Sequence, residues 1–245
     1  MYAISPNRQV LSYTTLQKKG RSLSDRSAAI GCLAEIIAGM KSGVTPFTEQ
    51  LYKIITAAIK DEDFEVRSNA AYAMGMLVEQ SGLDMSSQYP EMLRMLYPYF
   101  TPDNANGAAN GDASMVSAQG KGSARDNAAG AVSRMIVRSA SSLPLDQILP
   151  VLMAVLPLRN DFLENGPVFR AIFHLFRTQS NTLTPFLSDG SLLRVFKFVL
   201  DAKEVEGVDM ISDETKEELK QLISHLYQQD AVTIEAAGLA VYVAN

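Results

Sequence analysis

Apolar and polar positions alternate along most of this chain with the period of an amphipathic α-helix. The clearest stretch follows an acidic turn at Asp61–Glu65. Its small and apolar residues fall on one helical face, at Val66, Ala70, Ala73, Met74, Leu77 and Val78. Acidic residues in a turn that leads into a helix are favourably placed beside the partial positive charge of the helix N-terminus. This stretch therefore predicts a turn followed by a helix that begins near Val66.

The same pattern recurs along the chain. Arg67 lies 41 residues after Arg26 and 58 residues before Arg125, and Gly166 takes the equivalent place another 41 residues on. Each of these positions is followed by small or apolar residues at the same helical offsets. HEAT and armadillo units are about 40–47 residues long, so two of the three steps match this length and the third contains an insertion. The pattern indicates a helical repeat array.

The predicted fold class is all-α, a HEAT-repeat right-handed α-solenoid of about five helix pairs. The predicted repeats cover residues 7–40, 45–81, 88–139, 145–179 and 185–229. A first helix is expected at 7–19. Residues 101–124 are Gly, Ala, Asn and Ser with few bulky apolar side chains, so we expect a disordered insertion in the third repeat. The tail at 231–245 is weakly periodic and fits a capping helix, a frayed end or a segment foreign to the array.

Three details of the repeats are also predicted from the sequence. Pro46 is expected to open a helix, because proline is well tolerated at the first helical position. The helix after the insertion is expected to resume at Arg125, and residues 185–200 are expected to form one helix. Phe169, Phe173 and Phe176 lie at helical spacing and are interpreted as core residues.

Composition narrows the class of function. The 245 residues include 22 basic and 27 acidic side chains, which gives a net charge of −5. Nucleic-acid surfaces need clustered Lys and Arg, so the charge argues against direct nucleic-acid binding and favours basic partners. The single Cys32 excludes a disulfide framework and is expected to be buried. The most apolar run, residues 148–158, is too short to span a membrane, and the chain has no signal-like N-terminus and no Asn-x-Ser/Thr sequon. We therefore expect an intracellular protein without membrane insertion.

No catalytic, metal or cofactor site is recognisable in the sequence. The two histidines, His174 and His225, each lie among apolar neighbours, which is more typical of packed side chains than of metal ligands. Gly120-Lys121 resembles the end of a phosphate-binding loop, but Met115 occupies the place of the required glycine. The sequence thus predicts that the chain is not an enzyme and takes no cofactor.

The acidic turns allow two interpretations. In the structural one, Asp61 belongs to a ladder with Arg26, Arg67 and Arg125, in which acids cap helices and arginines bond the turns. In the functional one, acidic turns stacked repeat upon repeat form a negative stripe that binds a basic peptide. The candidate cargo-binding residues of that stripe are Asp61, Glu62, Asp63, Glu65, Asp161 and Glu164. The less structurally constrained members are Glu62, Glu65, Asp161 and Glu164.

Longer phrases carry a family resemblance. The segments 22–37, 65–75, 126–136 and 145–176 resemble the C-terminal repeats of the importin-β (β-karyopherin) superfamily, specifically the importin-4 type with its fungal relatives. The resemblance covers residues 8–228. It implies that the chain is a fragment of a receptor about four times longer. This fragment lacks the Ran-binding N-terminal repeats of the receptor. The insertion at 101–124 and the tail after residue 229 depart from the family pattern.

The resemblance also implies a function. Such receptors carry ribosomal proteins and core histones into the nucleus and release them when Ran-GTP binds. Basic cargo signals dock on the concave surface that the second helix of each repeat lines. The partners implied are basic cargo, with Ran-GTP and nucleoporins through the full-length receptor, and we expect a monomer that shuttles between cytoplasm and nucleus. The alternative is a generic HEAT scaffold that assembles a protein complex through apolar helix faces.

Overall fold

The computed structural model describes residues 22–101, 115–202 and 209–243, and across these ranges the chain forms helices and turns without a β-strand. The α-helices are α2 (Leu23–Met40), α3 (Thr48–Ala58), α4 (Phe64–Gln80), α5 (Tyr89–Leu96), α6 (Met115–Ser139), α7 (Leu145–Met153), α8 (Asn165–Thr178), α9 (Thr184–Ser188), α10 (Ser191–Asp201), α11 (Asp213–Gln229) and α12 (Ala231–Ala236). Short 3₁₀ segments lie at Lys41–Phe47, Ser86–Gln88, Tyr97–Tyr99, Ala140–Ser142, Phe162–Glu164, Ser180–Thr182 and Ala240–Tyr242. The prediction of an all-α array is confirmed, while the helix expected at 7–19 lies outside the described residues.

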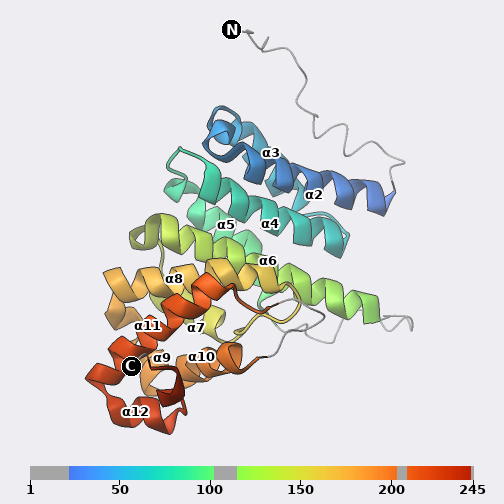
Figure 1. Ribbon diagram of the computed structural model, residues 1–245. Helices are drawn as coiled ribbons and strands as arrows, with labels where there is room; N and C mark the ends of the chain where they lie inside the picture. Colours follow the sequence, from blue (N-terminus) through green and yellow to red (C-terminus); the bar gives the residue numbers. More distant parts are fainter. Residues whose placement is uncertain (1–21, 102–114, 203–208, 244–245) are drawn as a thin grey trace.

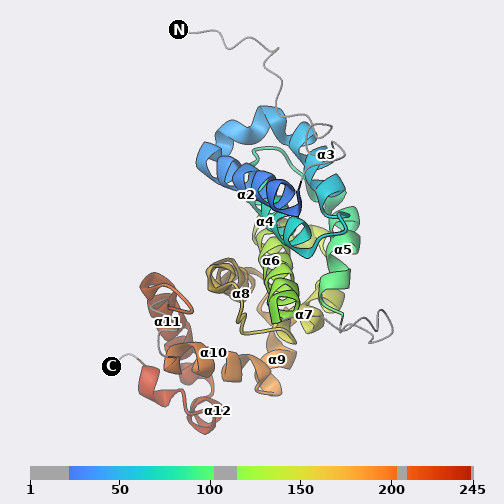
Figure 2. The same cartoon turned by 90° about the vertical axis from the view of Figure 1, so that its right-hand side faces the viewer.

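The helices form two layers. In Figure 1, α2, α4, α6 and α8 lie side by side, and each packs directly on the next. We call these four helices the stacked layer. Figure 2 shows α3, α5 and α7 on one side of it, and we call these three the flanking layer. Successive helix pairs therefore repeat the same two-layer unit, as a HEAT solenoid does. The core fills the space between the layers, and Phe169 and Phe173 belong to it.

Side-chain caps start several of these helices. The Ser22 hydroxyl accepts from the Asp25 backbone N–H, and the Asp25 carboxylate accepts from the Ser22 N–H, which completes a capping box for α2. Asp63 caps α4 and Ser212 caps α11. Pro46 does not open a helix as predicted, because it lies inside the 3₁₀ segment Lys41–Phe47 and α3 begins two residues later.

Residues 115–124, which were predicted to belong to the insertion in the third repeat, are helical. Helix α6 begins at Met115, ten residues before the predicted start at Arg125; residues 102–114 lie outside the described ranges. The small residues that suggested a loop instead permit close packing. A Cβ added at Gly122 would lie 2.4 Å from the side chain of Asn160, and Ala124 is fully buried. Helix α6 therefore passes against the turn between α7 and α8 at Gly122, where it has no side chain.

The segment 185–200 is two helices rather than the predicted one. Helix α9 ends at Ser188, and α10 begins at Ser191 after Gly190. Gly190 has a φ of 71°, which is strained for any residue with a Cβ. The Asp189 carboxylate accepts a 2.7 Å hydrogen bond from the Ser191 N–H and so begins the new helix. Asp-Gly is a turn signal that outweighed the apolar periodicity here.

The tail folds back on the last long helix. Helix α12 packs against α11, and Ile234 and Leu239 are buried. The Tyr227 hydroxyl donates to Glu235, and the Tyr242 hydroxyl donates to Asp201. Both apolar burial and hydrogen bonds therefore hold the described part of the tail.

Helix α2 buries one stripe of side chains, and Cys32 lies outside it. Its buried stripe is Ile30, Ala34 and Ile37, which packs toward α4, whereas Ile36 is 47% exposed. Cys32 is exposed, so the prediction of a buried thiol is wrong. Successive helical residues are separated by about 100°, and Cys32 therefore points away from the stripe that begins at Ile30.

One described segment, Ser24–Ala58, is long and apolar enough by length and composition to cross a membrane. It is not a single straight helix, because the 3₁₀ segment Lys41–Phe47 divides it into α2 and α3. Length and composition alone are weak evidence, since the core helix of a helical array passes the same test.

A close approach between α4 and α6 at Gly75 predicts a stability effect. A Cβ added at Gly75 would lie 2.9 Å from the backbone Cα of Ala131. We expect Gly75→Ala to destabilise the fold by about 1–2 kcal/mol, because the two helices must separate. The control is Gly39→Ala in α2, where an added Cβ meets nothing within 4 Å; that change should stabilise by about 0.5–1 kcal/mol through helix propensity. Urea unfolding of both variants tests the prediction, and a Gly75→Ala variant as stable as wild type would contradict it.

Candidate functional site

The turn between α3 and α4 gathers four of the six candidate acids. Asp61 receives both ends of the Arg26 guanidinium from α2, with Nε donating to Oδ2 at 3.1 Å and Nη2 donating to Oδ1 at 3.0 Å. Arg67 donates from Nη1 to the backbone oxygens of Asp61 and Glu62, at 2.6 and 2.9 Å. Two arginines from successive helices of the stacked layer therefore fix this turn.

The electrostatics of the turn follow from these contacts. Hydrogen bonding to Asp61 raises the pKa of Arg26. Asp63 accepts from the backbone N–H groups of Glu65 and Val66, at 2.9 and 3.2 Å, as the N-cap of α4. Asp61 and Asp63 are thus engaged in holding the turn.

Two carboxylates at this turn stay open to solvent. The Glu62 side chain is 84% exposed and has one longer contact, 3.4 Å, with Arg26 Nη2. Glu65 is exposed in the first turn of α4. We call Glu62, Asp63 and Glu65 the acidic edge, because they lie together where α4 begins.

Arg125 does not repeat this ladder. Its Nε lies 3.6 Å from Asp126 Oδ1 and makes no hydrogen bond. The neighbouring Asp126 bonds a turn in its place and is fully buried. Its Oδ2 accepts hydrogen bonds from the backbone N–H groups of Arg159, Asn160 and Asp161, at 3.1, 2.7 and 3.1 Å. In this repeat a carboxylate from α6 holds the turn between α7 and α8.

A second inter-helix ladder was not predicted. The side-chain amide of Asn69 donates to Ser27 O and Oγ, at 3.0 and 3.1 Å, and so joins α4 to α2. The amide of Asn127 donates to Ser68 O and Oγ, at 3.3 and 3.0 Å, and so joins α6 to α4. The signal was present in the sequence. Each Asn lies two residues after the arginine of its own repeat, and its Ser partner lies one residue after the arginine of the preceding repeat.

Glu164 is not an accessible cargo residue, and its assignment to the negative stripe is corrected. It is 2% exposed, and Arg134 binds its two oxygens through Nη1 and Nη2, at 2.5 and 3.0 Å. The Arg134 Nε donates to Glu79 at 2.9 Å, and Arg170 donates to the other Glu79 oxygen at 2.8 Å. Burial raises the pKa of Glu164. This network joins α4, α6 and α8 through side chains.

The room for this ion pair comes from a glycine. A Cβ added at Gly130 would lie 1.4 Å from Glu164 Oε2. Asp161 lies nearby, half-buried, and accepts from the Leu163 N–H at 3.2 Å. Burial raises its pKa as well. Asp161 therefore caps the short 3₁₀ segment before α8 and does not join the acidic edge.

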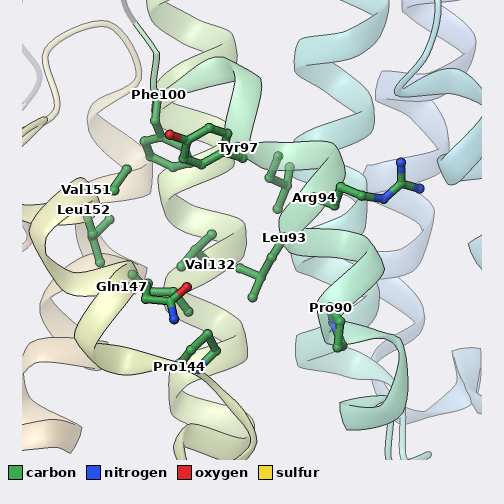
Figure 3. A pocket seen from close by; sticks show the side chains of 12 residues that line it. Pro90, Leu93, Arg94, Tyr97, Phe100, Val132, Pro144, Gln147, Val151 and Leu152 are labelled. Carbon is green, nitrogen blue, oxygen red and sulfur yellow. The ribbon is translucent and has the colours of Figure 1, made fainter.

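An apolar groove lies between helices of the flanking layer. Its volume is about 350 Å³. It lies between α5 and α7, and Val132 of α6 also lines it. Figure 3 shows Leu93 and Tyr97 on one side and Val151 on the other. Tyr97 is 57% exposed, so the groove presents an aromatic ring at the surface.

The described residues bring together no group of three or more His, Cys, Asp or Glu able to hold a metal ion. His174 is half-buried on α8, and His225 is exposed on α11 beside the Gln229 amide.

Comparison with known proteins gives three similar sequences. The chain is 34% identical over 221 residues to a probable importin subunit beta-4 of Schizosaccharomyces pombe. It is 27% identical over 220 residues to importin-4 of Homo sapiens and 27% identical over 222 residues to importin-4 of Mus musculus. Each match covers 90% of this chain and 18% of the relative, so the chain spans less than a fifth of the length of these curated relatives. No family model matches the chain.

Proposed function

Because the chain belongs to the importin-β superfamily, as a relative of the importin-4 type, we propose that it is the part of a nuclear import receptor that binds a basic cargo segment at the acidic edge. The relatives are named as importins. The proposed activity is reversible binding in which no covalent bond changes.

The observation that carries the proposal is the pair of exposed carboxylates, Glu62 and Glu65, on a turn held rigid by Arg26 and Arg67. A fixed turn loses little conformational freedom when a ligand binds, so more of the interaction energy appears as affinity. The net charge of −5 adds long-range attraction for a basic chain.

The finer parts of the proposal concern the whole receptor. We propose ribosomal proteins and core histones as cargo, because both classes carry lysine-rich segments that match the acidic edge. Release by Ran-GTP, contact with nucleoporins and shuttling between cytoplasm and nucleus are proposed for the full-length protein. As part of that receptor, the chain is proposed to act as a monomer, without direct binding to nucleic acid.

Charge reversal at the acidic edge tests the proposal. A fluorescein-labelled lysine-rich histone-tail peptide should bind this chain at low salt and weaken steeply at moderate salt. We expect Glu62→Lys/Glu65→Lys to reduce its affinity by about tenfold, a change of ~1.4 kcal/mol. Asp63 stays unchanged, because it caps α4 and its loss would destabilise the helix. Fluorescence anisotropy measures the affinity.

The matched control is Glu49→Lys/Glu214→Lys, which makes the same charge change at two exposed acids in the first turns of α3 and α11. Equal weakening in both double variants would mean that only net charge matters and would overturn the acidic edge as a site. Absence of binding by the wild-type chain at low salt would overturn the proposal outright.

The apolar groove favours a second candidate function, a scaffold that assembles a complex through apolar helix faces. An exposed Tyr97 beside Leu93 and Val151 is a surface that an apolar side chain would bury. Binding through it should persist at moderate salt and be lost on Val151→Asp. Salt dependence therefore separates the two functions.

A further inference from the structure

A pocket lined by three arginines lies on the stacked layer, away from the acidic edge. Its lining residues are Glu79, Arg134, Val137, Arg138, Pro167 and Arg170, and its volume is about 230 Å³. All six belong to α4, α6 or α8, so no helix of the flanking layer contributes. We call these six residues the arginine pocket.

The arginines of the pocket differ in how fully they are engaged. Arg134 is 7% exposed, and the carboxylates of Glu79 and Glu164 occupy its guanidinium. Arg138 is exposed and donates from Nη2 to Ser81 O at 2.9 Å. Arg170 is 53% exposed in its side chain and donates from Nη2 to Glu79 at 2.8 Å. A guanidinium carries five N–H donors, and the described hydrogen bonds engage one donor each of Arg138 and Arg170, which both line the pocket.

The charge of the pocket is positive. Three guanidinium groups face one carboxylate in the lining, Glu79, and one beneath it, Glu164. Hydrogen bonds from Ser86 lower the pKa of Asp84, and the charge of Arg138 adds a smaller lowering. Asp84 is exposed and is not part of the lining. The pocket therefore has positive charge that its own residues do not neutralise.

The pocket also has an apolar wall. Val137 is 40% exposed on α6, and Pro167 faces it from α8. Arginine forks bind carboxylates through two parallel hydrogen bonds, and the wall gives an adjacent apolar side chain a surface to cover. A phosphate or a nucleic-acid backbone fits less well, because Glu79 within the pocket and the net charge of −5 repel a multiply charged anion.

We propose that the arginine pocket docks an acidic segment of a partner protein, in which an Asp or Glu side chain lies beside an apolar residue. The carboxylate binds between Arg138 and Arg170, and the apolar side chain covers Val137 and Pro167. Glu79 lies in the last turn of α4 and the acidic edge at its first turn, so the two sites are about 20 Å apart along the helix. They take ligands of opposite charge and are independent of one another.

The experiment uses a short fluorescein-labelled peptide in which Glu and Leu alternate, with anisotropy measured at low and moderate salt. We expect the wild-type chain to bind it and Arg138→Gln/Arg170→Gln to lower the affinity by at least about tenfold. The control Arg94→Gln/Arg159→Gln removes two exposed arginines elsewhere and should leave binding within about twofold, since distant charges are largely screened. Thermal unfolding by circular dichroism checks that each variant is folded.

A second variant leaves every arginine in place. Val137→Asp puts a carboxylate on the pocket wall and should repel the acidic peptide, whereas Val241→Asp, at a 79% exposed position, should not. The histone-tail peptide should bind Arg138→Gln/Arg170→Gln as it binds wild type, and Glu62→Lys/Glu65→Lys should keep its affinity for the acidic peptide. Failure of one site is thereby distinguished from failure of the other.

Four outcomes would overturn the arginine pocket as a peptide site. The first is no binding of the acidic peptide to the wild-type chain at low salt. The second is equal loss in the Arg94/Arg159 control. The third is displacement of the peptide by inorganic phosphate at a similar concentration, which would indicate a simple anion site. The fourth is tighter binding of single-stranded DNA, lost on the same substitutions, which would indicate a nucleic-acid surface.

Discussion

Replacing Arg134 by methionine should lower the free energy of unfolding by about 3–5 kcal/mol, the range for removing one partner of a buried ion pair. Arg134 supplies both hydrogen bonds that the described structure gives to the Glu164 carboxylate, which is 2% exposed. Without it, Glu164 must either stay ionised in an apolar site or bind a proton. Glu79 suffers less, because it is partly exposed and keeps Arg170. Urea unfolding followed by circular dichroism measures the change.

The pH dependence of this variant has a definite sign. Burial already raises the pKa of Glu164 in the wild-type fold, and loss of Arg134 should raise it further. A carboxyl whose folded-state pKa exceeds its unfolded value binds more protons when folded, so its contribution to stability is present at low pH and lost as pH rises through the folded pKa. Arg134→Met should therefore be more destabilised, relative to wild type, at pH 7 than at pH 5.

Two companion variants make this prediction specific. Arg134→Met/Glu164→Met removes both charges and keeps similar volumes, so most of the stability should return. Glu164→Gln should cost less than Arg134→Met, because Arg134 keeps Glu79 as its partner. A double variant as unstable as Arg134→Met alone would show that packing around these side chains, rather than the unpaired charge, sets the loss.

The repeating helices could be read from the sequence because their signals are local. The acidic turn and the apolar stripe after Val66 place α4 within two residues of its observed start, and the repeat predicted at 145–179 contains α8, Asn165–Thr178. Helix α8 is strongly amphipathic, and α4, which is buried on most of its sides, has an N-cap in its own turn. The same turn held four of the candidate acids, so the location of the acidic edge followed from the sequence.

The exposure of individual acids could not be read in this way. Glu164 and Glu65 both follow an acidic turn, yet one is buried and the other is exposed. The difference comes from Arg134, which is 30 residues from Glu164 in the chain, and from the space left by Gly130. Helical periodicity gives the angle of a side chain about its own axis, and it does not show which neighbouring helix will cover that angle. The prediction that Cys32 is buried is wrong for the same reason.

Polar bridges recur between successive helices of the stacked layer. Asn69 joins α4 to α2, Asn127 joins α6 to α4, and Arg134 joins α6 to the N-cap residue of α8. Apolar burial alone would allow neighbouring helices to slide or rotate against one another, because hydrophobic contact is non-directional. Hydrogen bonds between fixed partners set the register of the stack. The acidic edge and the arginine pocket lie on this layer, so their geometry depends on that register.

Asp126 offers the sharpest test of this polar framework, and Asp126→Ala should cost about 2–4 kcal/mol of unfolding free energy. One fully buried oxygen accepts three backbone N–H groups from the turn before α8, and each hydrogen bond to a charged group contributes about 1.5–3 kcal/mol. The expected cost is smaller than three such contributions added together, because Arg159 and Asn160 are exposed and their N–H groups can bond to water instead. The loss should be concentrated in that turn.

Hydrogen exchange separates this mechanism from general destabilisation. In Asp126→Ala, the amides of residues 159–161 should exchange much faster, while those of α4 change only as far as global stability falls. Asp126→Asn keeps one acceptor oxygen and should cost less than half as much as the alanine variant. Unchanged exchange at 159–161 in Asp126→Ala would mean that the turn is held by its own chain. The carboxylate from α6 would then not be the link that positions Asp161 and Glu164 against the stack.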